Sequence, residues 1–351
     1  LGIPEARQLA ATFLEVDTDE VLVGGNSSLT LMFAYIDHML PVWRQELVGS
    51  KDAKIKFICP VPGYDRHFTI CEHFDIEMLN VPLLDGGPDM DQVEALIKQD
   101  PLIKGIWCVP KYSNPTGHTY NDAVVDRIAR LAEIAGEHFT ILWDNAYAVH
   151  HLSDTPDVLK NLMAEAKRQG NERSVVMLGS TSKITFAGAG IAFLAAEPNN
   201  LKAFEKYLSA SVIGFDKVNQ LRHVRFLKDA EHIAAHMVKH RNIIQPKFDL
   251  TLQILSEHLQ GKGIASWSQP RGGYFISLDT LPGLASEVIQ HAAAIGVKLT
   301  PAGATFPYGL DPQNSNIRIA PTFPTMDSLQ RALEVLVVCL QLATVNQFLS
   351  D

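Results

Sequence analysis

Cysteine is scarce in this sequence, positive charge is not in excess, and no apolar run is long. Only four of the 351 residues are cysteines; they are widely spaced and form no Cys-x-x-Cys pair, so we expect buried reduced thiols and neither disulfides nor a zinc site. The formal net charge of -9 argues against a nucleic-acid partner. The longest apolar segments, such as residues 333–342, are too short to span a bilayer. Together with the lack of a secretory-signal layout, these absences favour a cytoplasmic enzyme.

Short β-branched or apolar runs alternate with segments that have helical spacing. The predicted strands of the first part are 21–23, 55–59, 78–83, 105–109, 139–144, 174–179 and 191–196, and the predicted helices are 3–14, 29–47, 89–99 and 122–137. This alternation predicts an α/β fold with a mostly parallel, mixed sheet sandwiched by helices.

A second, smaller unit follows a long helical stretch that reaches from residue 198 to about 258. Strands are expected within 266–278, at 297–299 and at 317–319, with helices at 284–294 and 326–348. We therefore predict a large domain at 1–235 and a smaller C-terminal α/β domain at 236–351.

Lys183 follows a predicted buried strand, 174–179, through the turn Ser180-Thr181-Ser182. Ligands of open α/β sheets bind at the carboxyl ends of the strands. Because its neighbours are small or apolar, desolvation is expected to lower the pKa of the lysine, which would let the amine form a Schiff base with a carbonyl. Taken alone, a surface lysine after a strand is the commoner reading of this pattern.

A carboxylate and two possible ring contacts follow neighbouring strands. Asp144 ends an apolar strand, where an unpaired carboxylate is costly, so it needs either a cationic partner or a helix to cap. A protonated pyridine nitrogen would supply the cation, and Tyr147 could reach the phenolic oxygen of the same ring. Asn114, in an Asn-Pro turn with a candidate cis peptide bond, could donate to that oxygen or bond to its own turn. His150 and His151 are adjacent and therefore a poor pair for one ion, so we expect no metal site.

Two serine pairs and a tyrosine complete this set. Ser27 and Ser28 follow Gly24-Gly25-Asn26 at a helix start, where backbone N–H groups attract anions, although they could serve the helix only. Ser180 and Ser182 offer further hydroxyl donors to a phosphate. Tyr64 lies in a loop after a strand, where it could stack on a flat ring or only pack. A lysine, a nitrogen-pairing carboxylate, ring-oxygen donors, a stacking ring and phosphate donors are the requirements of pyridoxal 5'-phosphate.

The order Asn-Pro-x-Gly, Asp-x-x-Tyr, Ser-x-Ser-Lys over nearly the whole chain resembles the fold-type-I aminotransferases of class I/II. Segments 24–28, 63–68 and 180–190 look like the bacterial aspartate aminotransferase subgroup grouped with MocR-like aminotransferases. The resemblance implies that Lys183 is the Schiff-base lysine and general acid/base, Asp144 the pyridinium partner, Asn114 and Tyr147 the ring-oxygen contacts and Tyr64 the stacking ring. It implies that the phosphate ligands are Ser27, Ser28, Ser180 and Ser182. It also implies that Arg318 binds the substrate α-carboxylate and that Asn114 is a second substrate-binding residue. It also implies a ping-pong transamination between an amino acid, aspartate by preference, and 2-oxoglutarate in a homodimer.

The sequence departs from the family pattern in two ways. No arginine follows the lysine within 188–191, so the phosphate would rely on serines, backbone N–H groups or a residue from elsewhere. The chain also starts without Met, inside a helix-like segment, which leads us to expect that the family's N-terminal segment is absent. A distal substrate carboxylate needs another cation, and the unranked candidates are Lys217, Arg222, Arg225 and Arg271.

Two other functions remain open at this stage. The chain could be the non-catalytic sensing module of a MocR-type regulator, although no basic recognition helix is visible. It could also be a pyridoxal-phosphate lyase, because the same electron sink serves several reactions. Dependence of product formation on an amino acceptor would separate a lyase from a transaminase.

Overall fold

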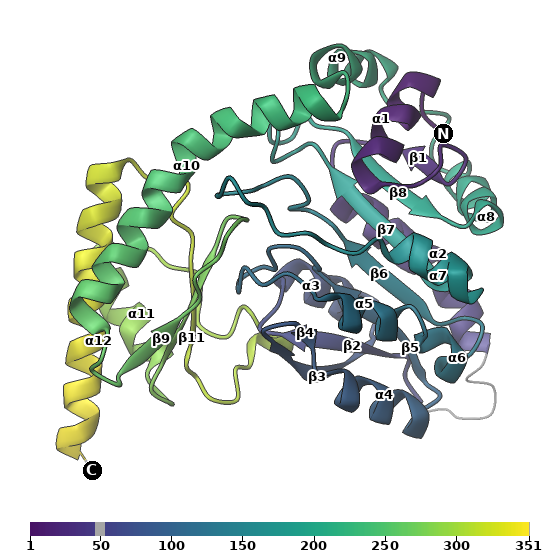
Figure 1. Cartoon of the computed structure of the whole chain (residues 1–351). Coiled ribbons are helices and arrows are strands. Elements are labelled where there is room, and N and C mark those ends of the chain that lie inside the picture. The colour runs from purple at the N-terminus through teal and green to yellow at the C-terminus, as the bar shows by residue number, and fades with distance from the viewer. Residues whose placement is uncertain (46–52, 351) are drawn as a thin grey trace.

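The structure is a computed structural model, and it describes residues 1–45 and 53–350. The last two residues of the predicted helix 29–47 lie outside the described residues. Two bodies are visible in Figure 1: a large sheet flanked by helices, and a smaller sheet covered by α11 (Ala285–Ala294) and α12 (Met326–Ser350). Helix α10 (Ala230–Leu259) runs along both.

The large body is built on an eight-stranded sheet of order β1-β8-β7-β6-β5-β2-β3-β4. Its strands are β1 (Val21–Val23), β2 (Lys56–Val61), β3 (Glu77–Leu84), β4 (Gly87–Pro88), β5 (Ile103–Cys108), β6 (Thr140–Asp144), β7 (Val175–Ser180) and β8 (Ala192–Ala196). Strands β3, β2, β5, β6 and β7 pair in parallel, whereas β8, β1 and β4 are antiparallel to their neighbours. The predicted mixed, mostly parallel sheet is confirmed.

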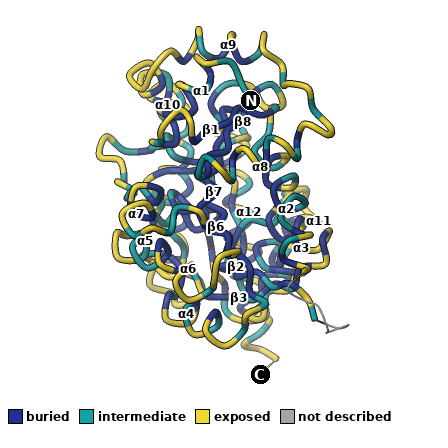
Figure 2. Tube along the Cα trace, turned by 90° about the vertical axis from the view of Figure 1, so that its right-hand side faces the viewer, coloured by how far each residue is buried: buried dark blue, intermediate teal, exposed yellow. Residues whose placement is uncertain are grey.

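Helices cover both faces of this sheet, which explains why its central strands are apolar throughout. Every residue of β5, β6, β7 and β8 is buried, as expected for strands packed on both faces. One face carries α1 (Pro4–Leu14), α4 (Met90–Gln99), α5 (Asp122–Ile128), α6 (Leu131–Ala135) and α7 (Leu162–Gln169), and the other carries α2 (Ser28–Gln45), α3 (Asp65–His73) and α8 (Pro198–Leu208). In Figure 2 the central strands are dark blue and the outer helix turns are yellow.

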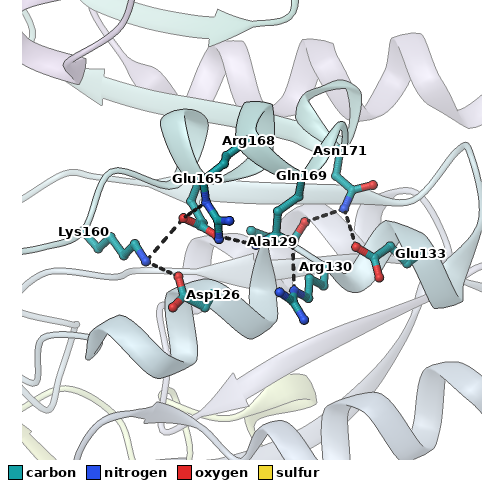
Figure 3. A network of polar contacts seen from close by, with 9 residues as sticks. All are labelled: Asp126, Ala129, Arg130, Glu133, Lys160, Glu165, Arg168, Gln169 and Asn171. Atoms are coloured by element: carbon teal, nitrogen blue, oxygen red, sulfur yellow. Dashed lines mark hydrogen bonds and ion pairs between the residues drawn. The ribbon is translucent and has the colours of Figure 1, made fainter.

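The helix predicted at 122–137 is wrong as a single element, because it breaks between α5 and α6 at Ala129 and Arg130. Asn171 donates from Nδ2 to the Ala129 carbonyl at 3.1 Å, and Arg130 donates from Nε to Gln169 Oε1 at 3.0 Å (Figure 3). Asn171 thus satisfies a carbonyl at the end of α5 from outside the helix, so the chain can turn there.

The small body holds a three-stranded antiparallel sheet of order β11-β10-β9. Its strands are β9 (Ala265–Trp267), β10 (Ile276–Thr280) and β11 (Asn316–Ile319). The strand predicted at 297–299 is wrong: Val297 and Leu299 lie outside any strand and pack, partly buried, on the core of this body. Their apolar character serves that packing. The predicted domain boundary after residue 235 falls inside α10, which continues without a break through Pro246.

Helix α12 is longer than the apolar segment considered in the sequence. Its length and composition would allow it to cross a membrane, and 39% of its most apolar window is buried in the protein. Its buried side chains, including Leu333, Leu336 and Leu340, pack in the core of the small body. The helix therefore has a structural role in a folded domain.

Candidate active site

Strands β5, β6 and β7 are parallel, so their carboxyl ends meet at one edge of the sheet. Asp144 is the last residue of β6, and Lys183 follows the last residue of β7, Ser180, in a turn. Lys183 Nζ lies 5.0 Å from the centre of the Tyr147 ring. The structure thus brings together the three residues predicted to be catalytic.

Asp144 is 3% exposed, and a histidine side chain contacts one of its two carboxylate oxygens. His67 Nε2 lies 3.1 Å from Oδ2, and because a carboxylate can only accept, Nε2 carries the proton. The His67 ring stacks on Trp107 with centres 4.1 Å apart and planes 8° apart. Among the described residues, Oδ1 of Asp144 has no hydrogen-bond partner. A buried carboxylate oxygen without a donor is a site for a cationic N–H group.

Burial lowers the pKa of Lys183, and the negative charge of Asp144 partly opposes this shift. Two groups fix the lysine's backbone: the Tyr274 hydroxyl donates to its carbonyl at 2.8 Å, and His150 Nε2 lies 3.4 Å from the same oxygen. Burial, together with the nearby Lys183 charge, lowers the pKa of His150 to about 3, so this imidazole is neutral. A neutral amine at position 183 is the nucleophile that a carbonyl requires.

Aromatic side chains form the wall between the lysine and the sheet edge. Tyr147 packs with Val109 and Tyr112, and Tyr64 and Tyr274 border this cluster. Burial raises the pKa of Tyr64 to about 12, so its phenol is protonated and can donate. Burial also raises the pKa of Tyr147 well above its usual value. These hydroxyls are available as donors to a ligand oxygen.

The two predicted phosphate loops are tied to each other. Asn26 donates from Nδ2 to the Gly188 carbonyl at 2.7 Å, and Ser182 donates from Oγ to the Asn26 carbonyl at 2.6 Å. A Cβ on Gly190 would lie 2.7 Å from Ser182 N, so only glycine allows this approach. Ser28 is the first residue of α2. The Ser182 hydroxyl therefore donates its proton within the protein. Its oxygen can then only accept hydrogen bonds, so in this arrangement Ser182 does not donate to a phosphate.

A cavity of about 640 Å³ opens beside these loops. Gly25, Asn26 and Gly188 line it, together with Arg222 from α9 (Lys217–Leu227). Arg222 donates from Nη2 to Asn219 Oδ1 at 2.6 Å and to the Ala189 carbonyl at 3.2 Å. This guanidinium brings positive charge to the loop that lacks an arginine of its own.

Arg318 enters the site from β11 of the small body. Its Nη1 donates to Asp65 Oδ1 at 2.9 Å and to Asn114 Oδ1 at 3.2 Å, and its guanidinium lies 5.1 Å from the centre of the Phe275 ring. Asn114 precedes a cis Asn114-Pro115 bond, as predicted. Arg318 and Asn114, the two residues predicted to bind the substrate, are therefore in contact. The carboxylate of Asp65 is hydrogen-bonded to the same guanidinium.

The other candidate cations differ in how they are held. Arg271 pairs with Asp157 at 3.2 Å, and Arg222 is bonded as described above. For Lys217 and Arg225, no ion pair with a described residue is seen. Arg66, two residues after Tyr64 in the first turn of α3, is exposed and has no ion pair within the described ranges, and it was not among the candidates.

Sequence reasoning missed His67, Asp65 and Tyr274. His67 lies three residues after Tyr64 in the first turn of α3, and that spacing after a strand could have suggested a second side chain facing the sheet edge. Asp65 shows no such signal, because its partner is 253 residues away. Tyr274 is likewise placed by the packing of the two bodies.

The residues fit pyridoxal phosphate by their chemistry. The partnerless Oδ1 of Asp144 suits a protonated ring nitrogen, and the buried amine of Lys183 suits an aldehyde. Comparison with known proteins gives the same answer. A model of the family described as "Aspartate amino-transferase" matches residues 1–351. The chain belongs to this family.

The relatives of this aspartate aminotransferase family member agree along the whole chain. An aspartate aminotransferase of Corynebacterium glutamicum is 43% identical over 350 residues, which is 99% of this chain and 80% of that protein. The crystal structure of an aspartate transaminase from the same species matches with a TM-score of 0.92 and 42% identity, over 99% of this chain and 82% of the other.

A more distant structure, α-aminoadipate aminotransferase LysN of Thermus thermophilus in complex with N-(5'-phosphopyridoxyl)-L-leucine, shares the fold with a TM-score of 0.80 at 21% identity, over 98% of this chain and 82% of that one. The chain is thus a fold-type-I, pyridoxal-phosphate-dependent aminotransferase that acts on amino acids and oxo acids, as its sequence predicts.

Proposed function

We propose that this aminotransferase moves the amino group of aspartate to 2-oxoglutarate in two successive half-reactions at one site. The observation that carries the proposal is Arg318, which faces Asn114 at the sheet edge where Lys183 and Asp144 lie. The relative of Corynebacterium glutamicum with the same substrate in its name supports aspartate. Pyridoxal phosphate, when bound, withdraws electrons from the carbon that loses its proton.

Of the chain's own residues, one supplies a fixed negative charge and another transfers a proton. Asp144, held by His67, keeps a negative charge where a ring nitrogen is protonated. Lys183 Nζ, whose pKa is lowered by burial, is the base that would take the α-proton of the amino acid and the acid that would deliver it away from the α-carbon. Tyr147 and Asn114 orient the ring oxygen, and Tyr64 covers the ring face.

Arg318 binds the substrate α-carboxylate in exchange for Asp65. In the structure, Nη1 of Arg318 donates a hydrogen bond to Asp65, and the Arg318 side chain is 11% exposed. A bidentate contact with a substrate carboxylate is stronger than this single bond. We therefore expect Asp65→Asn to lower KM for the amino acid several-fold and to leave kcat nearly unchanged, measured by steady-state kinetics.

The phosphate end rests on Ser27, Ser28 and Ser180, with Arg222 as the nearby cation, whereas Ser182, also predicted there, donates its hydroxyl proton to the Asn26 carbonyl in this structure. The cavity of about 640 Å³ beside these loops is lined by Arg222 and by none of the four serines, so it supports the part of this assignment that concerns the arginine. Arg222→Gln should weaken cofactor binding by about tenfold, the value of one charged contact. Arg225→Gln, from the same helix, is the control and should leave cofactor affinity unchanged.

The decisive test follows the visible absorption of the bound cofactor after addition of one amino acid without an acceptor. Aspartate should change the spectrum much faster than alanine or phenylalanine, and equal rates would rule out dicarboxylate selectivity. Lys183→Ala should lose the visible band and turnover, and a variant that kept both would contradict the assignment. Repeated turnover with release of ammonia in the absence of any oxo acid acceptor would instead support a lyase.

We also propose that the enzyme is a cytoplasmic homodimer. Exposed apolar side chains beside the lysine loop support a second subunit there: Phe186 is 69% exposed, Ile213 105% and Val218 80%. All four cysteines are free, which suits a reducing compartment. Light scattering of the purified protein should give twice the chain mass, and a monomer at micromolar concentration would refute the dimer.

A further inference from the structure

A second cavity, of about 670 Å³, lies behind the active site. It is enclosed by the end of α1, segment 153–162, and the first turns of α10, and β6 and β7 form its floor. Cavities of ~300–1,000 Å³ are the size that proteins use for small organic ligands. No function described so far uses this space.

The pleat of β6 separates this cavity from the active site. Successive side chains of a strand point to opposite faces, and Trp143 lines the cavity whereas Asp144 faces His67. Beyond the strand, Asn145 lines the cavity and Tyr147 packs towards Lys183. The same segment therefore lines both the cavity and the active site, but the two are separate spaces.

Most charged groups that line the cavity are already committed. Arg241 pairs with Asp154 at 2.6 Å. Asp157 pairs with Arg271. Lys160 binds Asp126 and Glu165, as Figure 3 shows. Glu15, at the end of α1, is exposed.

Lys111 is different. Within residues 1–45 and 53–350 its ammonium has no ion pair or hydrogen bond, and the side chain is half-buried with Nζ 5.6 Å from the Tyr112 ring. Burial lowers the pKa of Lys111, and the negative charges of Glu15 and Asp157 partly oppose this shift. Among the described residues neither carboxylate forms an ion pair with the ammonium, so a bound anion would supply the direct contact that it lacks.

A polar group and apolar walls complete the cavity. Asn145 Oδ1 is buried and, among the described residues, without a partner. Its amide can turn to offer either the oxygen or the nitrogen to a ligand. His151 lies 2.9 Å from the Tyr112 hydroxyl, and burial lowers its pKa to about 4, so it adds no charge at neutral pH. Apolar side chains, among them Val149 and Met237, supply the remaining wall.

We propose that this cavity binds a small carboxylic acid with an apolar body, whose carboxylate pairs with Lys111 and whose polar atoms meet the Asn145 amide. The acid lies against the side of segment 145–151 that faces away from Tyr147. It is a second ligand site of the enzyme, independent of the amino-acid substrate.

Calorimetric titration of the cofactor-loaded enzyme with 3-phenylpropionate tests the proposal. Binding should be weakened about tenfold or more in Lys111→Gln, the loss of one charged contact. Lys160→Gln, which removes a cavity-lining lysine already held by carboxylates, is the matched control and should change affinity less than about threefold. Phenethylamine, which has the same apolar body without the carboxylate, should not bind there.

A second variant fills the space. Ala234 lies on the exposed side of α10 and lines the cavity, so Ala234→Trp should block 3-phenylpropionate without disturbing the core. Unchanged affinity in both Lys111→Gln and Ala234→Trp would overturn the proposal. If affinity is lost instead in Arg318→Gln, the acid binds at the substrate site and the second site does not exist.

Discussion

Replacing His67 by Phe tests the support of the central carboxylate. The change removes the Nε2 donor that lies 3.1 Å from Asp144 and keeps an aromatic ring to stack on Trp107. A hydrogen bond to a charged group contributes ~1.5–3 kcal/mol, which corresponds to roughly 10- to 150-fold in an equilibrium or rate. The stack contributes less, ~0.5–1.5 kcal/mol. The lost bond should therefore dominate over any change in stacking.

The assay is the rate of the first half-reaction with excess aspartate, followed by the cofactor's visible absorption in a stopped-flow instrument. We expect His67→Phe to be slower than the parent enzyme by roughly 10- to 150-fold. His67→Gln retains an amide donor and loses the ring, so it is the matched control and should lose less. If His67→Phe keeps the parent rate while His67→Gln loses it, stacking and not the hydrogen bond matters, and the reasoning fails. Thermal unfolding of both variants checks that they are folded.

Three further outcomes follow from burial and close contact. Burial lowers the pKa of Lys183 and the charge of Asp144 opposes this, so cofactor uptake by the cofactor-free protein should reach half its maximal rate below pH 10.5. In Asp144→Asn the midpoint should lie at a still lower pH. A midpoint above pH 10.5 would contradict the direction of the pKa shift. Gly190→Ala pushes a Cβ to 2.7 Å from Ser182 N, so cofactor affinity should fall while the sheet stays intact by circular dichroism. Leu340→Ala, at a fully buried position, should destabilise the small body by ~2–5 kcal/mol, seen as faster hydrogen exchange in β10 and β11.

The sequence alone predicts residues that sit at the ends of parallel strands. Asp144 and Lys183 could be placed together because apolar runs mark their strands, and parallel strands end at one edge. The sequence does not show that β8 and β1 turn antiparallel, because an edge strand and a central strand can have the same apolar pattern. Pairing order depends on contacts between distant segments.

Contacts across the two bodies were the least predictable part of the site. Asp65 meets Arg318 only because the small body folds against the large one, and no local pattern contains that information. The helix at 122–137 has continuous helical spacing, yet it breaks where the Asn171 side chain binds the Ala129 carbonyl. In both cases a partner far along the chain decides the outcome, and local propensity is overridden.

Helix α10 and several hydrogen bonds join the small body to the large one. Helix α10 is continuous between them, Gly273 N donates to the His150 carbonyl at 2.9 Å, and Gly63 N donates to the Thr305 carbonyl at 2.7 Å. The Tyr274 hydroxyl and the Arg318 guanidinium add hydrogen bonds to the Lys183 carbonyl and to Asp65. Because these contacts come from several segments, the small body is not a free hinge, and any swing that carries Arg318 away from Asn114 must first release some of these hydrogen bonds or bend the helix.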